Sequence, residues 1–232
     1  MLKVVPIPIL NDNYIWTIIH DKKTVVVDPG LSDPVLNYHQ RNNLELTAVL
    51  ITHHHHDHIG GIDGIINQCN VPVYAPYHEK FNFKYHQVQE ESKIQLFNNT
   101  LEFSVMEVPG HTLEHIIYHG NKLLFCGDTL FSFGCGRIFE GTYRQMFDSL
   151  KKFKSIDPDS KVYCTHEYTL KNLEFLKNYF KDNAFYEKKY QNLSKSMITL
   201  PSLLKDELES NPFLNSSYEE FKKLREAKDL FK

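Results

Sequence analysis

Five histidines and an aspartate share the segment Thr52-His53-His54-His55-His56-Asp57-His58. An apolar run, 48–51, precedes the segment directly, and Gly60-Gly61 follows it. This order predicts a loop at the carboxyl end of a strand, the place where ligands gather in open α/β sheets. Imidazole rings are costly to bury unless their nitrogens are bound, so a metal is the expected partner. A purification tag is the alternative, but tags lie at chain ends rather than between a strand and a glycine turn.

The loop alone can serve two metal ions. In an extended segment His53 and His55 project to the same side, because side chains alternate along extended backbone. A turn after them brings Asp57 and His58 to a neighbouring position. The residues at the alternate positions are expected not to be metal ligands: His54 and His56.

Three further apolar runs end in residues that can bind a metal. Run 105–108 leads to Pro109-Gly110-His111-Thr112, run 123–126 to Gly127-Asp128-Thr129, and run 162–164 to Thr165-His166-Glu167. Each alone is more often a turn or a satisfied polar residue. Together with the histidine loop they give imidazoles and carboxylates that suit Zn(II), Fe(II) or Mn(II). The candidate ligands are His53, His55, Asp57, His58, His111, Asp128 and His166.

The composition excludes several classes of protein. The 232 residues include 26 Lys plus Arg against 29 Asp plus Glu, for a net charge of -3, and 41% are hydrophobic. A chain of this size forms one large domain, or one domain with an appendage. It lacks the basic excess of a nucleic-acid binder. No apolar run approaches the ~20 residues that cross a bilayer, so we expect no membrane partner.

The cysteines and the N-terminal sequence predict a cytoplasmic protein. Four cysteines lie far apart without CxxC pairs, which indicates reduced thiols. A softer metal site that uses Cys126 and Cys164 is the alternative to packed thiols. The opening MLKVVPIPIL contains prolines and no cleavage motif, so it reads as a strand rather than a secretory signal.

The pattern of elements predicts a mixed α/β fold with a helical tail. Strands are expected at 3–10, 14–19, 24–27, 48–51, 103–108, 123–126 and 161–163. Helical spacing places helices around Ile62 to Cys69 and around Met146 to Phe153. From residue 169 onward a helical period dominates. In the tail, Thr199 with Pro201 predicts one helix start, and Ser217 with Glu220 forms a capping-box spacing before the last helix.

The loop pattern THxHxDH resembles the metallo-β-lactamase superfamily, and later motifs resemble its glyoxalase II (hydroxyacylglutathione hydrolase) family. The resemblance runs nearly end to end. These motifs are Val27-Asp28-Pro29-Gly30, Pro109-Gly110-His111-Thr112, Phe125-Cys126-Gly127-Asp128-Thr129-Leu130-Phe131, Gly134-Cys135-Gly136-Arg137, Phe139-Glu140-Gly141-Thr142, His166-Glu167-Tyr168-Thr169, Asn211-Pro212-Phe213-Leu214 and Lys228-Asp229. The resemblance implies an αββα sandwich with a helical C-terminal segment. We accordingly expect a catalytic domain at 1–168 and a substrate-binding segment at 169–232.

The resemblance also implies how the ligands are shared. It assigns His53, His55 and His111 to the first of two divalent ions, and Asp57, His58 and His166 to the second. Asp128 would bridge them. We expect zinc first, with iron or manganese as alternatives. The implied reaction, in a monomer, is hydrolysis of S-D-lactoylglutathione to glutathione and D-lactate by a hydroxide between the ions, the second step of methylglyoxal detoxification.

Glutathione carries two carboxylates, so its site needs cations. The last predicted helix places Arg225 and Lys228 on a face that can edge a cleft, although a solvated basic face is the plain alternative. By resemblance, Arg137, Phe139 and Tyr168 join them. Some family members have Lys and Tyr where this chain has Arg137 and Phe139, so one hydroxyl contact is lost. The family motif also continues with Arg where this chain has Asn215.

Two kinds of alternative function remain open from the sequence. One is another metallo-β-lactamase-fold enzyme, a persulfide dioxygenase or a lactonase. The other is a non-catalytic metal-binding domain on the same scaffold. Retention of all seven ligands favours the dinuclear hydrolase over both.

Overall fold

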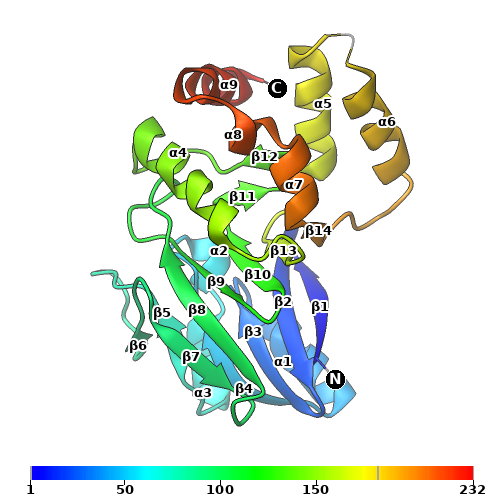
Figure 1. Cartoon of the computed structure of the whole chain (residues 1–232). Coiled ribbons are helices and arrows are strands. Elements are labelled where there is room, and N and C mark those ends of the chain that lie inside the picture. The colour runs from blue at the N-terminus through cyan, green and yellow to red at the C-terminus, as the bar shows by residue number, and fades with distance from the viewer. Residues whose placement is uncertain (1, 182, 232) are drawn as a thin grey trace.

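Two six-stranded sheets stack face to face in the computed structural model, which describes residues 2–181 and 183–231 (Figure 1). The first sheet has the order β1-β2-β3-β4-β5-β6: β1 (Leu2–Ile9), β2 (Asn13–His20), β3 (Lys23–Val27), β4 (Glu45–Leu50), β5 (Val73–Ala75) and β6 (His86–Gln87). The second has the order β14-β13-β10-β9-β8-β7: β14 (Ser202–Leu203), β13 (Lys161–Cys164), β10 (Leu123–Gly127), β9 (Ile116–Gly120), β8 (Leu101–Glu107) and β7 (Lys93–Leu96). A small hairpin pairs β11 (Leu130–Phe131) with β12 (Gly134–Cys135).

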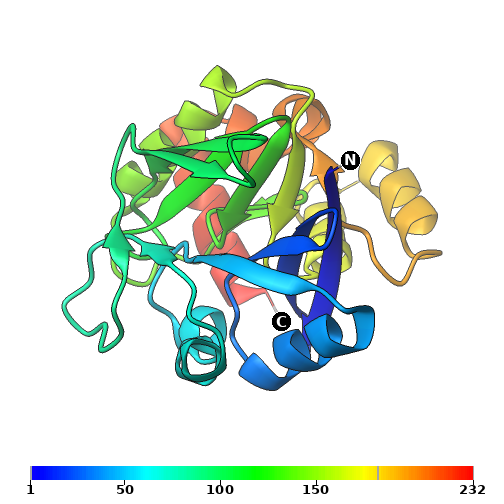
Figure 2. The same cartoon turned by 90° about the horizontal axis from the view of Figure 1, so that it is seen from below.

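Helices lie on both sides of the sheet pair, as Figure 2 shows. Helices α1 (Ser32–Asn42) and α3 (Ile62–Gln68) cover the outer face of the first sheet, and α4 (Tyr143–Lys152) lies on the side of the second. The remaining helices are α2 (His56–Ile59), η1 (Phe153–Ser155), α5 (Thr169–Tyr179), α6 (Ala184–Leu193), α7 (Leu204–Ser210), α8 (Pro212–Asn215) and α9 (Tyr218–Leu230). The expected αββα sandwich with a helical C-terminal segment is confirmed.

Alternation along the strands sorts apolar side chains between two cores. On β3, Val25 and Val27 face the second sheet and join the larger core, whereas Val26 faces α1 and α3. There Val26 belongs to the same buried cluster as Val35 and Ile65. Because successive side chains on a strand point to opposite faces, a fully apolar strand predicts cover on both sides.

The loops that carry the candidate ligands meet at one end of the sandwich. Strand β4 runs parallel to β3, and β13 runs parallel to β10, so each pair ends at the same edge of its sheet. The sheets are joined at this end by a bridge between Asn13 and His166, where the Tyr14 amide donates to the Thr165 carbonyl at 2.7 Å. Loops after β4, β8, β10 and β13 are thereby brought together.

Several elements differ from the sequence-based predictions. Each expected strand is present, with bounds shifted by a few residues, but α1 and strands β5, β6, β7, β9, β11 and β12 were not predicted. Helix α1 buries only Val35 and His39, so its apolar period is weak. The helix start predicted from Thr199 and Pro201 is wrong, because 202–203 pair with β13 as β14 and α7 begins at Leu204. The capping box of Ser217 and Glu220 is confirmed.

None of the helices formed by 2–181 and 183–231 combines the length and the apolar character needed to span a bilayer.

Candidate metal centre and its pocket

Three imidazoles from two loops converge on one point. His53 and His55 follow β4, and His111 follows β8. The Nδ1 atom of His55 lies 3.1 Å from Nε2 of His53 and 3.0 Å from Nε2 of His111. A tetrahedral zinc ion with its usual bond lengths spaces its ligand atoms by about 3.3 Å. The three nitrogens therefore have nearly the spacing of a ligand set.

A second group of three lies beside the first. Oδ2 of Asp57 is 3.6 Å from Nε2 of His58 and 3.5 Å from Nε2 of His166. Asp57 and His58 belong to the short helix α2, and His166 follows β13. Two imidazoles and a carboxylate oxygen thus face one another across the end of the sandwich.

Asp128 lies between the two groups. Its Oδ2 is 3.5 Å from Nε2 of His111 and 3.2 Å from Nε2 of His166, and its Oδ1 is 3.5 Å from Nε2 of His58. The structure therefore brings all seven candidate ligands together, with Asp128 touching both halves.

The polar atoms at the centre indicate that the cluster fits metal ions. Nε2 of His58 and Oδ1 of Asp128 are buried and have no hydrogen-bond partner among residues 2–181 and 183–231. A buried polar atom without a partner costs about 1–3 kcal/mol. An ion between these two atoms removes that cost, and imidazole with carboxylate is a suitable donor set for zinc, iron or manganese.

Three of the candidate ligand rings, those of His58, His111 and His166, are held by a contact on their far side. Nδ1 of His58 lies 3.0 Å from Oδ2 of Asp28, and Nδ1 of His166 lies 2.8 Å from Oδ1 of Asp12. Nδ1 of His111 lies 2.7 Å from the Arg137 carbonyl. Such contacts orient the ring and raise its basicity as a ligand. Sequence reasoning did not identify Asp12 or the role of Asp28, because neither lies near its histidine in the chain.

The chain places Asp128 through a tight turn. Gly127 ends β10 at φ 47°, in the left-handed region, and a Cβ there would lie 2.4 Å from Oγ1 of Thr52. Glycine is the residue that meets both demands without strain. The Asp128 amide then donates to Nε2 of His115 at 3.1 Å. His115 is buried and stacks on His53, so it positions Asp128, a role the sequence reading missed.

Electrostatics divide the histidines into two sets. Burial lowers the pKa of His53, His55 and His111, with further lowering by neighbouring imidazoles, so these rings are neutral and ready to bind a metal. Burial also disfavours charge on His166, but Asp128 and Asp12 outweigh it and raise its pKa to about 9. A metal ion at His166 would have to displace this proton.

A pocket of about 310 Å³ opens beside the ligands. The pocket lies between the candidate ligands His111 and Asp128 on one side and helix α9, which contributes Arg225 and Lys228, on the other. Its lining residues are His111, Asp128, Phe131, Cys135, Arg137, Phe139, Tyr168, Asn172, Arg225 and Lys228. All five residues predicted to bind substrate line this pocket: Arg137, Phe139, Tyr168, Arg225 and Lys228.

The cations of the pocket differ in how they are held. Arg225 is buried and donates to the Cys135 carbonyl and to Oδ1 of Asp229, both at 2.8 Å. Nε of Arg137 lies 3.5 Å from the same Asp229 oxygen, but this side chain remains 58% exposed. Asp229 therefore sets the spacing of the two guanidinium groups, and Arg137 is the more available one.

Comparisons with known proteins identify the family. Residues 11–166 match the model of the metallo-beta-lactamase superfamily, and 167–231 match that of the hydroxyacylglutathione hydrolase C-terminus. A hydroxyacylglutathione hydrolase from Nitrosomonas europaea is 44% identical over 222 residues, covering 92% of this chain and 83% of the relative. One from Aliivibrio fischeri is 46% identical over 229 residues, covering 96% and 90%.

The chain belongs to the hydroxyacylglutathione hydrolase family of the metallo-beta-lactamase superfamily. The predicted resemblance to glyoxalase II is thus confirmed. The metallo-beta-lactamase fold extends to more distant proteins: the crystal structure of ETHE1 from Myxococcus xanthus superposes with a TM-score of 0.73 at 24% identity, covering 97% of this chain and 90% of that one. The superfamily fold and the histidine–aspartate cluster together indicate divalent metal ions.

Proposed function

We propose that the protein hydrolyses the thioester S-D-lactoylglutathione to glutathione and D-lactate. The observation that carries the proposal is a single pocket that combines candidate metal ligands with cations able to bind the carboxylates of glutathione. His111 and Asp128 lie at its metal-binding end, and Arg137, Arg225 and Lys228 lie at its cationic end. The curated relatives named hydroxyacylglutathione hydrolase support this assignment.

The proposed cofactors are two divalent ions, zinc first, with iron or manganese as alternatives. His53, His55 and His111 would hold one, and Asp57, His58 and His166 the other, with Asp128 shared. When bound, such a pair of ions lowers the pKa of water to about 7 and polarises the substrate carbonyl. The chain then needs no serine or cysteine nucleophile.

Aromatic side chains shape the reaction end of the pocket. The Phe139 ring lies edge-on to His55 and His111, with centroids 5.6 and 5.2 Å away. Tyr168 stacks on His166 at 4.7 Å. These rings restrict the motion of the imidazoles and keep bulk water from one side of the thioester.

The cations at the other end bind the carboxylates of the glutathione moiety. Arg137 offers an exposed guanidinium for a bidentate contact. Lys228 lies over the rings of Phe175 and Phe231, and its ammonium donates to the Lys171 carbonyl at 3.2 Å. Burial and the neighbouring Arg225 lower the pKa of Lys228 to about 8, so it is charged at neutral pH.

We extend the proposal to the organisation and setting of the protein. Residues 1–168 act as the catalytic domain and 169–232 as the substrate-binding segment. The protein works as a cytoplasmic monomer in the second step of methylglyoxal detoxification, without nucleic-acid or membrane partners.

The decisive experiment is an assay of the purified protein after reloading with zinc. We expect release of glutathione from S-D-lactoylglutathione, measured as free thiol. An acyl thioester of N-acetylcysteamine, which lacks the peptide carboxylates, is the matched control and is expected to react with a much higher KM. A fully metallated sample that leaves the thioester intact, but opens a lactone or oxidises glutathione persulfide, contradicts the proposal.

A further inference from the structure

A second cluster of metal-binding side chains lies outside the seven ligands: His54, His78 and Glu114. One ligand atom from each lies within 4.8 Å of the others, and all three residues are partly buried. They come from three loops that are far apart in the chain, after β4, between β5 and β6, and between β8 and β9. Because three separate loops supply them, their meeting is a product of the fold and not of a local histidine run.

The contacts around His54 define the cluster. Its Nδ1 lies 2.5 Å from Oε1 of Glu114, and its backbone amide donates to the same oxygen at 3.1 Å. Its Nε2 lies 3.4 Å from Oε1 of Glu140, from the loop before α4. The His78 ring lies parallel to the His54 ring, with centroids 3.9 Å apart and planes 6° apart. Carboxylates therefore face both nitrogens of one imidazole, and a second imidazole covers its face.

A simple ion pair does not account for this arrangement. An ion pair needs one imidazole and one carboxylate, whereas here a second carboxylate, Glu140, and a second imidazole, His78, also face the His54 ring. Burial and the neighbouring His54 ring lower the pKa of His78, which keeps its nitrogens available as donors. Two neutral imidazoles with one or two carboxylates form a donor set that suits zinc and similar ions.

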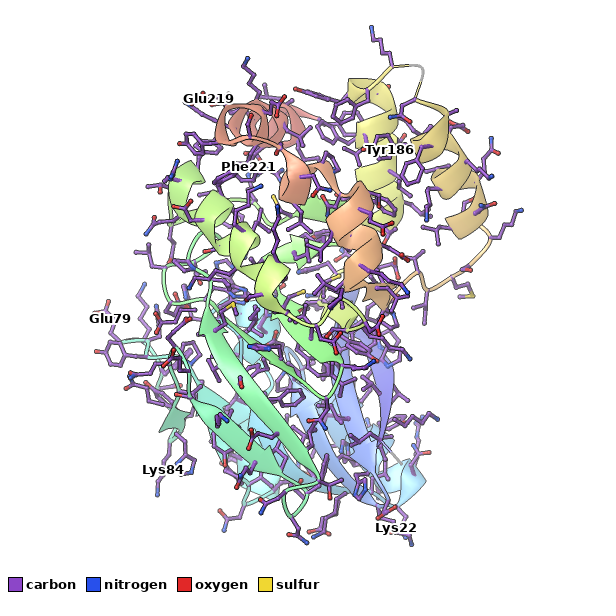
Figure 3. The ribbon with its side chains drawn as sticks, viewed as in Figure 1. Lys22, Glu79, Lys84, Tyr186, Glu219 and Phe221 are labelled. Carbon is purple, nitrogen blue, oxygen red and sulfur yellow. The ribbon has the colours of Figure 1, made fainter. Side chains whose placement is uncertain are left out.

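We propose that His54, His78 and Glu114 bind a third divalent metal ion, with Glu140 in reach as a fourth ligand. Imidazole lone pairs lie in the plane of the ring, so the His78 ring must turn out of its stack to reach the ion. The turn would give up the contact of the Lys80 amide with Nδ1 of His78 at 3.4 Å. The neighbouring Tyr77 and Glu79 are exposed, and Glu79 lies at the edge of the molecule (Figure 3).

The third site is distinct from the proposed dinuclear centre but adjacent to it. The His54 ring lies 5.1 Å from the His55 ring, so the two sites share the backbone of one loop. The proposal does not depend on thioester hydrolysis. It departs from the expectation that His54 is not a metal ligand, because that expectation considered only the side to which His53 and His55 project.

Metal stoichiometry tests the site. The full chain is stripped with a chelator, reloaded with Zn²⁺ and desalted, and zinc per chain is measured by elemental analysis. We expect three ions in the wild type, and two in His78→Ala and in Glu114→Gln. His86→Ala is the matched control, because this exposed histidine lies on β6 at the far end of the same loop. It is expected to keep three.

Each outcome decides for or against the proposal. Two ions in the wild type, three ions in either folded variant, or loss of an ion in His86→Ala overturns it. Circular dichroism checks folding, and the two variants are judged separately, so that misfolding of one leaves the other decisive. Thioester hydrolysis measured on the same samples reports on the proposed function, so the two proposals fail independently.

Discussion

The metal-binding cluster and the cationic end of the pocket are built in opposite ways. The cluster uses short side chains, most of them buried, and rings such as His58 and His166 are held from behind by a carboxylate. The cationic end uses long side chains that differ in mobility: Arg225 is buried and held by two hydrogen bonds, whereas Arg137 is 58% exposed. Rigid groups that touch the reacting atoms control rate, whereas an exposed cation far from the reaction, such as Arg137, controls affinity. Substitutions in the two regions should therefore change different kinetic constants.

Removal of Asp128 tests the rigid region most severely. We expect Asp128→Ala to lower kcat by at least about 10³-fold, more than the loss of a single oxyanion donor, because both halves of the cluster lose a ligand. Metal content measured beside the kinetics should fall as well. Asp148→Ala, an exposed carboxylate on α4, is the control. A variant that keeps a tenth of the wild-type kcat contradicts the shared role of Asp128.

The carboxylate behind His166 should have a smaller effect. Asp12→Ala leaves the ligand in place but removes the contact to its Nδ1. We expect the affinity for one metal ion to fall by about 10–100-fold. Competition with a chelator of known affinity measures this loss, and Asp63→Ala on the exposed face of α3 serves as control. Equal affinities for the variant and the wild type exclude an orienting role for Asp12.

At the cationic end, Arg137→Ala should change KM rather than kcat. A charge-assisted contact from an exposed side chain contributes about 1 kcal/mol, so we expect KM to rise roughly fivefold to tenfold. Steady-state kinetics with S-D-lactoylglutathione provide the measurement. Arg144→Ala, an exposed arginine on α4, should leave KM unchanged. A fall in kcat with constant KM would break the division between the two regions.

The pH dependence of KM should reveal Lys228. Its pKa is lowered to about 8, so the ammonium binds an anion below that pH and loses its charge above it. We expect KM to rise by roughly threefold to fivefold between pH 7 and 9, a loss of part of one charged contact. Lys228→Arg keeps its charge and should show no such rise. The same rise in both proteins assigns the effect to another group.

Phe139→Tyr should have the smallest effect of these substitutions. The ring lies at the border of both regions, edge-on to His55 yet 61% exposed. A hydroxyl here restores one neutral hydrogen bond, which contributes about 0.5 kcal/mol, so KM should fall about twofold. The kcat value should not change. Isothermal titration with glutathione checks the same gain without turnover.

Residues whose position follows from the neighbouring sequence could be predicted. Asp128 and His166 follow apolar runs directly, and the ends of parallel strands meet at one edge, so strand ends alone grouped the candidate ligands. The same reasoning had no access to Asp12, which lies 154 residues from His166. Contacts of this kind depend on how the two sheets are joined. His78 and Glu114 escaped prediction for the same reason.

The same difference between local and long-range contacts explains why one of the two helix starts predicted in the tail was confirmed and the other was wrong. Ser217 and Glu220 cap α9 through contacts within four residues, and the spacing alone was sufficient to predict them. Thr199 instead donates its hydroxyl to Glu167, which lies 32 residues earlier. Its side chain therefore anchors the tail to the loop after β13 and starts no helix. Long-range partners override local preference in such segments.

The bridge between Asn13 and His166 has a consequence for how the protein matures. Neither sheet carries all seven candidate metal ligands. The first sheet leads into the histidine loop, and the second leads into the loops with His111, Asp128 and His166. A half-folded chain would therefore hold cations weakly, and a nascent polypeptide would capture them only after its halves close. Metal binding would therefore select chains in which both sheets have folded and met. At a free metal concentration of 1,000 times the dissociation constant, each bound ion would raise the free energy of unfolding by about 4 kcal/mol.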